Sequence, residues 1–381
     1  MKKKLCLLLS YILVAALASA ATLGIHDWLG GESKLTQLSQ LISECYIEDV
    51  DSVALEDAAA AAMLEATGDR WGYYIPASEM AAHRESVENA YVGIGITITV
   101  AHDGDGLQIM EVNPGSSAQE AGLQVDDVII AIEGQPTGEM TTTDARNLVR
   151  GEEGTQVTIT VRRGGEMLDF SVTRRKVEVI VAQGQMLENH VGLITITNFD
   201  ERCADETIAA IESLLAQGME KLIFDVRNNP GGYAEELVEV LDYLLPEGEL
   251  FRTVNYQGRE TVDSSDADCL EIPMAVLVNG DSYSAAEFFA AALQEYEAAV
   301  VVGEKTTGKG YFQNTFYLVD GSGAAISTGK YFTPKGVSLE GVGITPDVMI
   351  PADPETALAI YYGQLAPQED PQLLAALAAL D

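Results

Sequence analysis

The chain has 381 residues, 47% of them apolar, and 22 Lys and Arg stand against 59 Asp and Glu, for a formal charge of −37. This length suffices for two or three domains with large cores, and the acidic balance argues against nucleic acids and anionic lipid headgroups as general partners. The four cysteines, Cys6, Cys45, Cys203 and Cys269, show no C-x-x-C spacing and no neighbouring His cluster, which argues against a disulfide framework or a structural zinc site.

Residues 1–23 have the composition of an export signal. Three lysines, Lys2 to Lys4, precede an apolar run, and Ala18-Ser19-Ala20 supplies the small residues that a signal peptidase accepts. The run extends to Leu23 and then approaches the roughly 20 residues needed to span a bilayer. We therefore expect an exported, extracytoplasmic protein, and the segment is either a cleaved signal peptide or a retained membrane anchor.

The N-terminal region, residues 33–88, shows apolar residues at helical spacing as far as Met63. Two helices joined by an acidic turn at residues 48–51 are the simplest interpretation. Gly68 and Pro76 then interrupt the pattern, so the aromatic residues 71–74 are expected in a loop.

Residues 89–179 change to the alternating pattern of half-buried strands. Ile94, Ile96 and Ile98 alternate with smaller residues, residues 157–161 repeat the pattern, and residues 142–149 are typical of a helix. The sequence predicts a small, strand-rich domain here.

Residues 180–363 alternate strand-like and helix-like segments, a pattern that indicates βα units around a largely parallel, buried sheet. The Ala-rich residues 364–381 are expected to form a helical tail. The whole chain is therefore predicted to be a multidomain α/β protein.

The first candidate catalytic turn runs from Asp225 to Gly232 and follows a buried strand. Gly231 and Gly232 would let backbone N–H groups converge on a substrate oxygen, as an oxyanion hole requires. The Gly-Gly pair alone is also what an ordinary tight turn uses.

The second turn places Ser284 at the start of a helix, directly after a strand. Its hydroxyl is a candidate nucleophile, with the Ala285 N–H facing the developing oxyanion. The alternative is a capping box between Ser284 and Glu287. The segment also lacks the final glycine of the hydrolase G-x-S-x-G turn.

The third turn, Gly303 to Gly310, nearly matches a phosphate-binding loop, but Gly310 stands where a hydroxyl should hold magnesium. Lys309 is then either solvated or directed into a site. A Ser327–Lys330 pair is excluded because an offset of three places the two residues on opposite faces of a strand. None of the four histidines lies in a strand-to-helix turn of this region, which argues against a Ser-His-Asp triad.

Taken together, these turns resemble the carboxyl-terminal processing proteases, serine peptidases that have a Ser–Lys dyad and an inserted PDZ domain. The resemblance covers nearly the whole chain after residue 23 and is carried by residues 282–287, 303–310 and 225–232, together with the 25-residue interval from Ser284 to Lys309. Residues 68–74 resemble the family's G-D-P-Y-x-x-Y segment. Arg70, Pro230 and Tyr283 depart from the family pattern at positions that bear on substrate preference more than on catalysis.

The resemblance implies a ββα-type, crotonase- and ClpP-like protease core with an N-terminal helical arm. It implies an endopeptidase acting near protein C-termini, with Ser284 as nucleophile, Lys309 as base and Gln313 orienting the lysine. The oxyanion N–H groups would come from Ala285 and from Gly232 first and Gly231 second. The resemblance implies no metal or organic cofactor. It also implies that the protein forms a homodimer.

In the PDZ domain, the implied peptide-binding residues are the loop Gly93, Ile94, Gly95 and Ile96 and the pocket walls Ala145, Leu148 and Val149. Leu148 is equally well explained as a core residue. The implied ligands are proteins or peptides with apolar C-terminal tails, whose binding would also gate the protease. A catalytically silent PDZ scaffold and a crotonase-like acyl enzyme are the alternatives.

Overall fold

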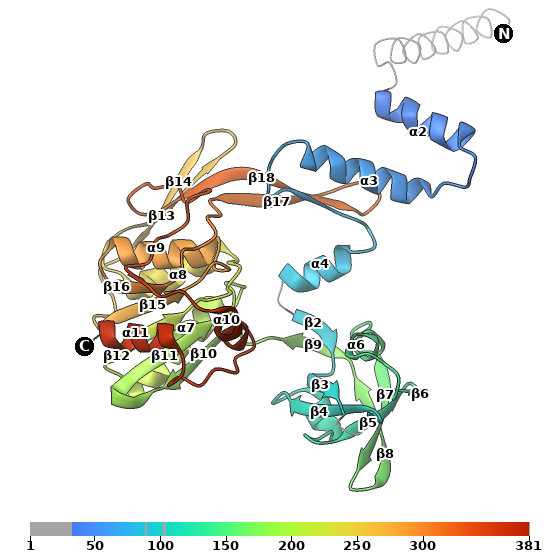
Figure 1. Ribbon diagram of the computed structural model, residues 1–381, viewed down its shortest axis with the longest axis horizontal. Helices are drawn as coiled ribbons and strands as arrows, with labels where there is room; N and C mark the ends of the chain where they lie inside the picture. The colour runs from blue at the N-terminus through green and yellow to red at the C-terminus, as the bar shows by residue number, and fades with distance from the viewer. Residues whose placement is uncertain (1–32, 88–89, 102–103, 381) are drawn as a thin grey trace, which may run out of the picture.

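The computed structural model of the chain describes residues 33–87, 90–101 and 104–380, which form an N-terminal arm, a small β-rich domain and a larger α/β core (Figure 1). The segment 1–23, expected to be a signal peptide or anchor, lies outside the described residues. Within the described ranges, no helix has both the length and the apolar character needed to span a bilayer.

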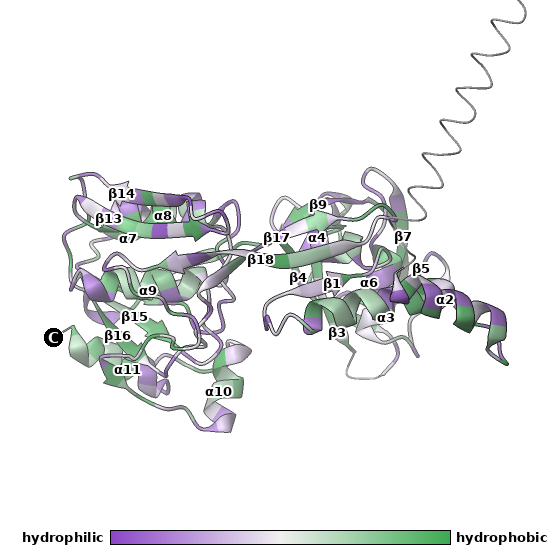
Figure 2. Cartoon of the chain, turned by 90° about the horizontal axis from the view of Figure 1, so that it is seen from above, coloured by the Kyte–Doolittle hydropathy of each residue, from purple (hydrophilic) through white to green (hydrophobic). Residues whose placement is uncertain are grey.

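The arm contains the two predicted helices, α2 (Lys34–Cys45) and α3 (Ser52–Glu65), followed by β1 (Tyr73–Ile75) and α4 (Met80–Val87). Asp51, in the predicted acidic turn, caps α3 by accepting the N–H groups of the second and third helical residues. Neither α2 nor α3 buries a residue, and in Figure 2 α2 carries both hydrophobic and hydrophilic stretches.

The expectation of an aromatic loop at residues 71–74 is wrong for its second half. Tyr73 and Tyr74 lie in β1, which pairs antiparallel with strand β18 (Gly323–Phe332). The Tyr74 hydroxyl donates to the Asp57 carboxylate of α3 at 2.7 Å, which joins the arm to this strand. The pairing depends on a partner far along the chain, so local patterning does not reveal it.

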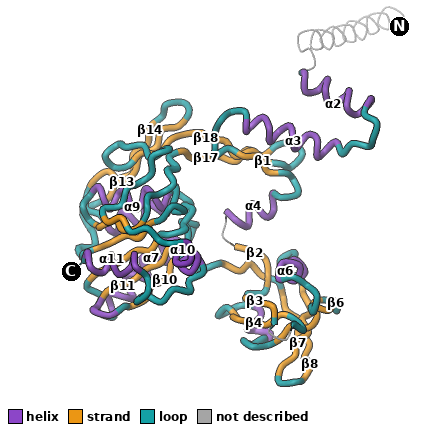
Figure 3. Tube along the Cα trace, in the orientation of Figure 1, coloured by secondary structure: helices purple, strands orange, loops and turns teal. Residues whose placement is uncertain are grey.

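The small domain consists mainly of strands, as its alternating pattern predicted (Figure 3), and these strands pair antiparallel. Strands β3, β4, β5, β7 and β8 form its sheet in that order, and a separate ribbon of β2 and β9 connects it to the rest of the chain. Inward-facing residues such as Ile109, Ile129 and Ile159 are fully buried. Its elements are β2 (Ala90–Gly93), β3 (Ile96–Val100), β4 (Leu107–Val112), α5 (Ser117–Ala121), β5 (Val128–Ile132), β6 (Gln135–Pro136), α6 (Thr142–Val149), β7 (Gln156–Arg163), β8 (Glu166–Thr173) and β9 (Arg175–Glu178).

The core has a six-stranded sheet in the order β10-β11-β12-β15-β16-β19, in which only the edge strand β10 is antiparallel. One face packs against α7, α8 and α9, and the other packs against α11. The elements that build these layers are β10 (Ala182–Met186), η1 (Glu188–His190), β11 (Val191–Ile196), α7 (Cys203–Ala216), β12 (Lys221–Asp225), α8 (Ala234–Leu244), β15 (Met274–Val278), α9 (Ala285–Glu295), β16 (Ala299–Gly303), β19 (Val348–Met349), α10 (Pro354–Tyr361) and α11 (Pro371–Ala379).

The C-terminal segment is part of the core as well as helical. Leu373 and Ala376 of α11 are buried against Ile223 and Leu277 of the sheet. At the start of α11, Asp370 forms an ion pair with Arg227, with 2.8 Å between Asp370 Oδ2 and Arg227 Nη2. The helix therefore covers a sheet face that would otherwise expose apolar side chains.

A second, antiparallel sheet in the order β1-β18-β13-β14, with β17 also paired to β18, extends from the core towards α3 (Figure 1). Its remaining strands are β13 (Gly248–Asn255), β14 (Glu260–Ser265), β17 (Tyr311–Tyr317) and β18 (Gly323–Phe332). Strand-like runs at residues 311–318 and 324–328 predict β17 and half of β18, whereas the sequence predicts neither β13 nor β14.

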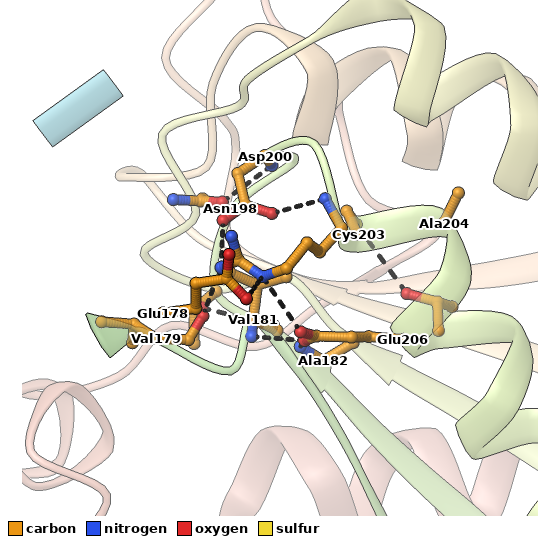
Figure 4. A network of polar contacts seen from close by, with 12 residues as sticks. Glu178, Val179, Val181, Ala182, Asn198, Asp200, Cys203, Ala204 and Glu206 are labelled. Atoms are coloured by element: carbon orange, nitrogen blue, oxygen red, sulfur yellow. Dashed lines mark hydrogen bonds and ion pairs between the residues drawn. The ribbon is translucent and has the colours of Figure 1, made fainter. Parts of the chain in front are cut away.

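Where the chain leaves the small domain, a polar network joins it to the core (Figure 4). Arg202 donates to the Val179 carbonyl and to the buried carboxylate of Asp200, both at 2.7 Å, and to Glu206 at 3.3 Å. Glu206 in turn accepts the N–H groups of Val181 and Ala182. The residues between β9 and β10 are thus held to the start of α7.

Candidate active site

Ser284 lies at the turn between β15 and α9 and has φ of 57° and ψ of −127°. A residue other than glycine rarely adopts this backbone conformation, which costs about 1–3 kcal/mol and recurs at functional sites. The opposing turn approaches closely, because a Cβ built on Gly231 would lie 2.7 Å from Ser284 Cβ. The surrounding fold therefore holds the candidate nucleophile in a strained turn.

Glu287, one turn into α9, is fully buried and connects the segments of Ser284 and Lys309. Its Oε2 accepts the backbone N–H groups of Ser284 at 3.1 Å and Lys309 at 2.7 Å. Its Oε1 accepts the Gly308 N–H at 2.7 Å and the Thr306 hydroxyl. The Ser284-x-x-Glu287 spacing predicts that Glu287 takes part in a capping box at the start of α9. In the structure its carboxylate also accepts three hydrogen bonds from the distant lysine loop, namely from Thr306, Gly308 and Lys309.

Lys309 follows β16 and is half-buried. Burial lowers the pKa of its amine, while the charges of Glu340 and Asp69 act in the opposite direction. A lowered pKa is the property that a lysine needs to serve as a general base.

The Lys309 amine lies beside two aromatic rings. Its Nζ is 5.1 Å from the Trp71 ring centroid and 5.7 Å from that of Tyr283, and the two centroids are 6.4 Å apart. Ring faces attract an ammonium ion at such distances. Lys309 and Ser284 both lie in the described part of the chain, and no hydrogen bond joins Lys309 Nζ to Ser284 Oγ. In this structure the amine instead contacts the Trp71 and Tyr283 rings.

Trp71 is itself held by the core. Its indole N–H donates to both carboxylate oxygens of Glu340, at 3.1 and 3.2 Å, and Glu340 also accepts the Gly310 N–H at 2.8 Å. Arg70 donates to the Gly308 carbonyl, and its guanidinium lies 4.3 Å from the Trp71 ring centroid. Sequence reasoning missed this contact, although Arg70 and Tyr283 had stood out as departures from the family pattern.

The two candidate oxyanion glycines differ in the availability of their N–H groups. Gly231 donates to the Asn229 side-chain oxygen at 2.8 Å. The Gly232 N–H has no such partner among the described residues, and Gly232 is exposed to the cleft. Ala285 occupies the first position of α9, where the N–H has no partner within the helix. Gly232 and Ala285 therefore fit the role, whereas the Gly231 donor is already used.

Gln313, expected to orient Lys309, is differently engaged. Its side-chain amide donates to the Tyr311 carbonyl at 3.1 Å and to the Ser327 hydroxyl at 3.0 Å. A register shift in β17 falls just before Gln313, and the lysine amine is drawn towards the rings. The expected Gln313–Lys309 hydrogen bond is therefore absent between these two described residues.

A cleft of about 680 Å³ nevertheless collects most of the predicted catalytic residues. Ser284, Lys309, Gln313, Gly231 and Gly232 all line it. Several aromatic residues complete its walls, namely Tyr73, Phe199, Tyr233, Tyr283, Tyr311, Phe312 and Tyr331. The arrangement has room for a peptide segment and presents a hydroxyl, an amine and free N–H donors to it.

The small domain has its own groove, between β3 and α6. Gly93, Ile94, Gly95, Ile96 and Val149 line it, as predicted for the peptide-binding loop and one pocket wall. Two further predicted walls lie elsewhere: Ala145 is fully buried in the domain core and Leu148 packs against that core. On α6 these two residues face inward, so the core explanation holds for both.

Comparison with known proteins defines the class. The profile of peptidase family S41 matches residues 190–350 and that of the PDZ domain matches residues 108–163. A structure of an S41 protease candidate from Bacteroides fragilis shares the fold, with a TM-score of 0.54 at 17% identity, over 90% of this chain and 96% of that one.

Two curated relatives narrow the class. The carboxy-terminal processing protease CtpA of Bacillus subtilis is 32% identical over 365 residues, covering 91% of this chain and 78% of the relative. The carboxyl-terminal-processing protease of Synechocystis is 34% identical over 292 residues, covering 75% of this chain and 67% of the relative. The chain therefore belongs to the carboxyl-terminal processing proteases of family S41, which makes it a serine protease.

Proposed function

We propose that this protease is an extracytoplasmic endopeptidase that cleaves proteins near their C-termini with a Ser284–Lys309 dyad. The observation that carries the proposal is the buried Glu287 carboxylate, because it fixes the backbone of both residues at one wall of the cleft. The strained backbone of Ser284 and the lowered pKa of Lys309 support the same assignment.

In the proposed reaction, the neutral Lys309 amine takes the Ser284 hydroxyl proton while Oγ attacks the peptide carbonyl carbon. The N–H groups of Gly232 and Ala285 hold the resulting oxyanion. Collapse of this intermediate breaks the peptide C–N bond, and the leaving amine takes the proton from Lys309. Water, deprotonated by Lys309, then attacks the acyl carbon; the acyl C–Oγ bond breaks, and Ser284 Oγ takes the proton back from Lys309. Gln313 lines the same cleft and would orient the lysine once the amine has left the rings.

We also propose that the PDZ groove binds substrate tails and gates the dyad. The chain leaving this domain is bound by Arg202 and Glu206, and Arg202 also pairs with Asp200, the residue after Phe199. The Phe199 N–H donates to the Gly231 carbonyl at 2.9 Å, and the Tyr233 N–H donates to the Phe199 carbonyl. This contact path supports transmission from the PDZ domain to the oxyanion turn.

The remaining proposals concern architecture and location. We propose a crotonase- and ClpP-like core type, export directed by residues 1–23 and, where that segment is retained, membrane anchoring. A homodimer would use helices α2 and α3 of the arm, which bury no residue and expose apolar side chains such as Leu38, Leu41 and Val53. The proposed partners are apolar-tailed proteins or peptides and do not include nucleic acid.

The test uses the chain without residues 1–23 and an unstructured protein substrate with an apolar C-terminus. We expect cleavage near that terminus, and at least about a thousandfold loss of kcat in both Ser284→Ala and Lys309→Ala. Circular dichroism and thermal melting should show that both variants remain folded. If both variants keep wild-type activity, the dyad is not the catalytic machinery.

A further inference from the structure

The groove of the PDZ domain carries a local charge opposite to that of the protein. Among the described residues, its lining contains two arginines, Arg146 and Arg150, and no acid, in a chain with 59 acidic and 22 basic residues. The other lining residues are apolar, aromatic, Gly or Thr. A groove of this kind is suited to a ligand with both apolar and anionic groups.

The two arginines are not equivalent. Arg150 forms an ion pair with Glu85 of α4 at 2.7 Å, and its guanidinium lies 4.6 Å from the Tyr91 ring centroid. Arg146 is exposed and makes no ion pair or side-chain hydrogen bond within the described part of the chain. The acid nearest to it on α6, Asp144, is hydrogen-bonded to Thr141 at the helix start. Arg146 is therefore the cation that a bound ligand meets.

The direction of the groove follows from the same contacts. Because Arg150 lies over Tyr91, the C-terminal end of α6 is beside the loop that begins at Gly93. A peptide tail that adds to β3 would place its terminal carboxylate at this loop and its last side chain against Val149. The preceding residues would then run along α6 towards its N-terminus.

Distances along the bound peptide and along α6 identify the peptide residue that Arg146 would contact. In an extended peptide, the next side chain on the same face belongs to the residue two before the last, about 6.6 Å away. On α6, Arg146 lies three residues before Val149, about 4.5 Å along the axis, and helical side chains lean further towards the N-terminus. The long Arg146 side chain therefore reaches this third-from-last residue of the tail.

We propose that Arg146 determines tail specificity, so that the groove selects peptides with an apolar last residue and Asp or Glu two residues before it. The inference rests on the proposed peptide-tail binding and adds to it the charge of one ligand position.

The experiment measures binding of fluorescein-labelled peptides by anisotropy to the full chain carrying Ser284→Ala, which prevents cleavage. Three peptides differ only in their endings, Glu-Ala-Val, Gln-Ala-Val and Lys-Ala-Val. At about 0.05 M salt we expect Kd for the Glu peptide to be about two- to fivefold lower than for the Gln peptide, and this difference to shrink at high salt. Arg146→Gln should abolish the preference, and Arg146→Glu should reverse it in favour of the Lys peptide. Lys335→Gln, which removes the same charge from an exposed position on the core, should leave it unchanged.

Each other outcome overturns a distinct claim. If all three peptides bind equally and Arg146→Glu has no effect, the specificity inference is wrong although tail binding stands. If Arg146→Glu weakens all three equally, Arg146 reads the terminal carboxylate, which also contradicts the inference. If neither the three peptides nor their C-terminally amidated versions bind, the proposed tail binding itself fails.

Discussion

The carboxylate of Glu287 accepts the backbone N–H of Lys309 at 2.7 Å, across 22 residues of chain. The same carboxylate accepts the Ser284 N–H at 3.1 Å, so one buried side chain sets the spacing of the two proposed dyad residues. Each of its oxygens receives two donors, which leaves no place for a group that donates.

For that reason we expect Glu287→Gln to be harmful even though it preserves size. The introduced NH₂ group would face two donors, leaving buried polar groups unpaired at a cost of about 1–3 kcal/mol in the free energy of unfolding. The displaced backbone should lower kcat at least about tenfold. Denaturant unfolding and steady-state kinetics measure the two effects. Glu295→Gln, on the same helix but outside the dyad contacts, is the control, and an unaltered kcat in Glu287→Gln would contradict the positioning role.

The pH dependence of catalysis should report Lys309. The base acts when its amine is neutral, so kcat/KM should rise with pH through the lysine pKa, and burial places this rise below the usual value near 10.4. Because the Glu340 charge raises that pKa, Glu340→Gln should move the rise to lower pH, while the amide oxygen still accepts from Trp71. Glu220→Gln, an exposed distant change, should leave the profile in place. A shift to higher pH in Glu340→Gln would be inconsistent with Lys309 as the base.

Gly232 should tolerate no side chain. Its φ is 153°, and an added Cβ would lie 2.1 Å from the Phe199 carbonyl oxygen, so the turn that presents the N–H must shift. We expect Gly232→Ala to lower kcat by about 10²- to 10³-fold, the usual effect of losing an oxyanion donor. Gly258→Ala also has a positive φ but meets no atom within 4 Å, and its kcat should stay near wild type. Equal activity in the two variants would remove Gly232 from the mechanism.

The ion pair of Arg227 and Asp370 should stabilise the core. Both side chains are 6% exposed, and Asp370 also caps α11. Asp370→Asn keeps the cap oxygen but removes the charge, and we expect a loss of about 1–3 kcal/mol in the free energy of unfolding, moderated because Asp225 still pairs with Arg227. Urea titration measures this loss. The comparison is Asp353→Asn, at the exposed cap of α10, which should have a smaller effect. Equal losses in the two variants would mean that the ion pair with Arg227 adds no stability.

The sequence pattern predicted those helices and strands that are stabilised by interactions within their own segment. The limits of α6 match the expected residues 142–149 because its capping box, between Thr141 and Asp144, and its apolar spacing are both local. β13 and β14 were missed because neither has the alternating burial of a half-buried strand, and β13 also pairs with the distant β18. The site shows the same division: residue identity indicated Ser284 and Lys309, but the resting place of the lysine amine depends on Trp71, which comes from another part of the fold.

The pairing of β1 with β18 has a consequence for biosynthesis. Tyr74 is opposite Ala324, so more than half the chain separates the two strands, and α11 at the far end covers the parallel sheet. Contacts of such long sequence separation form late and slowly. A chain emerging from the ribosome therefore cannot complete its core until α11 has also emerged and can cover the sheet.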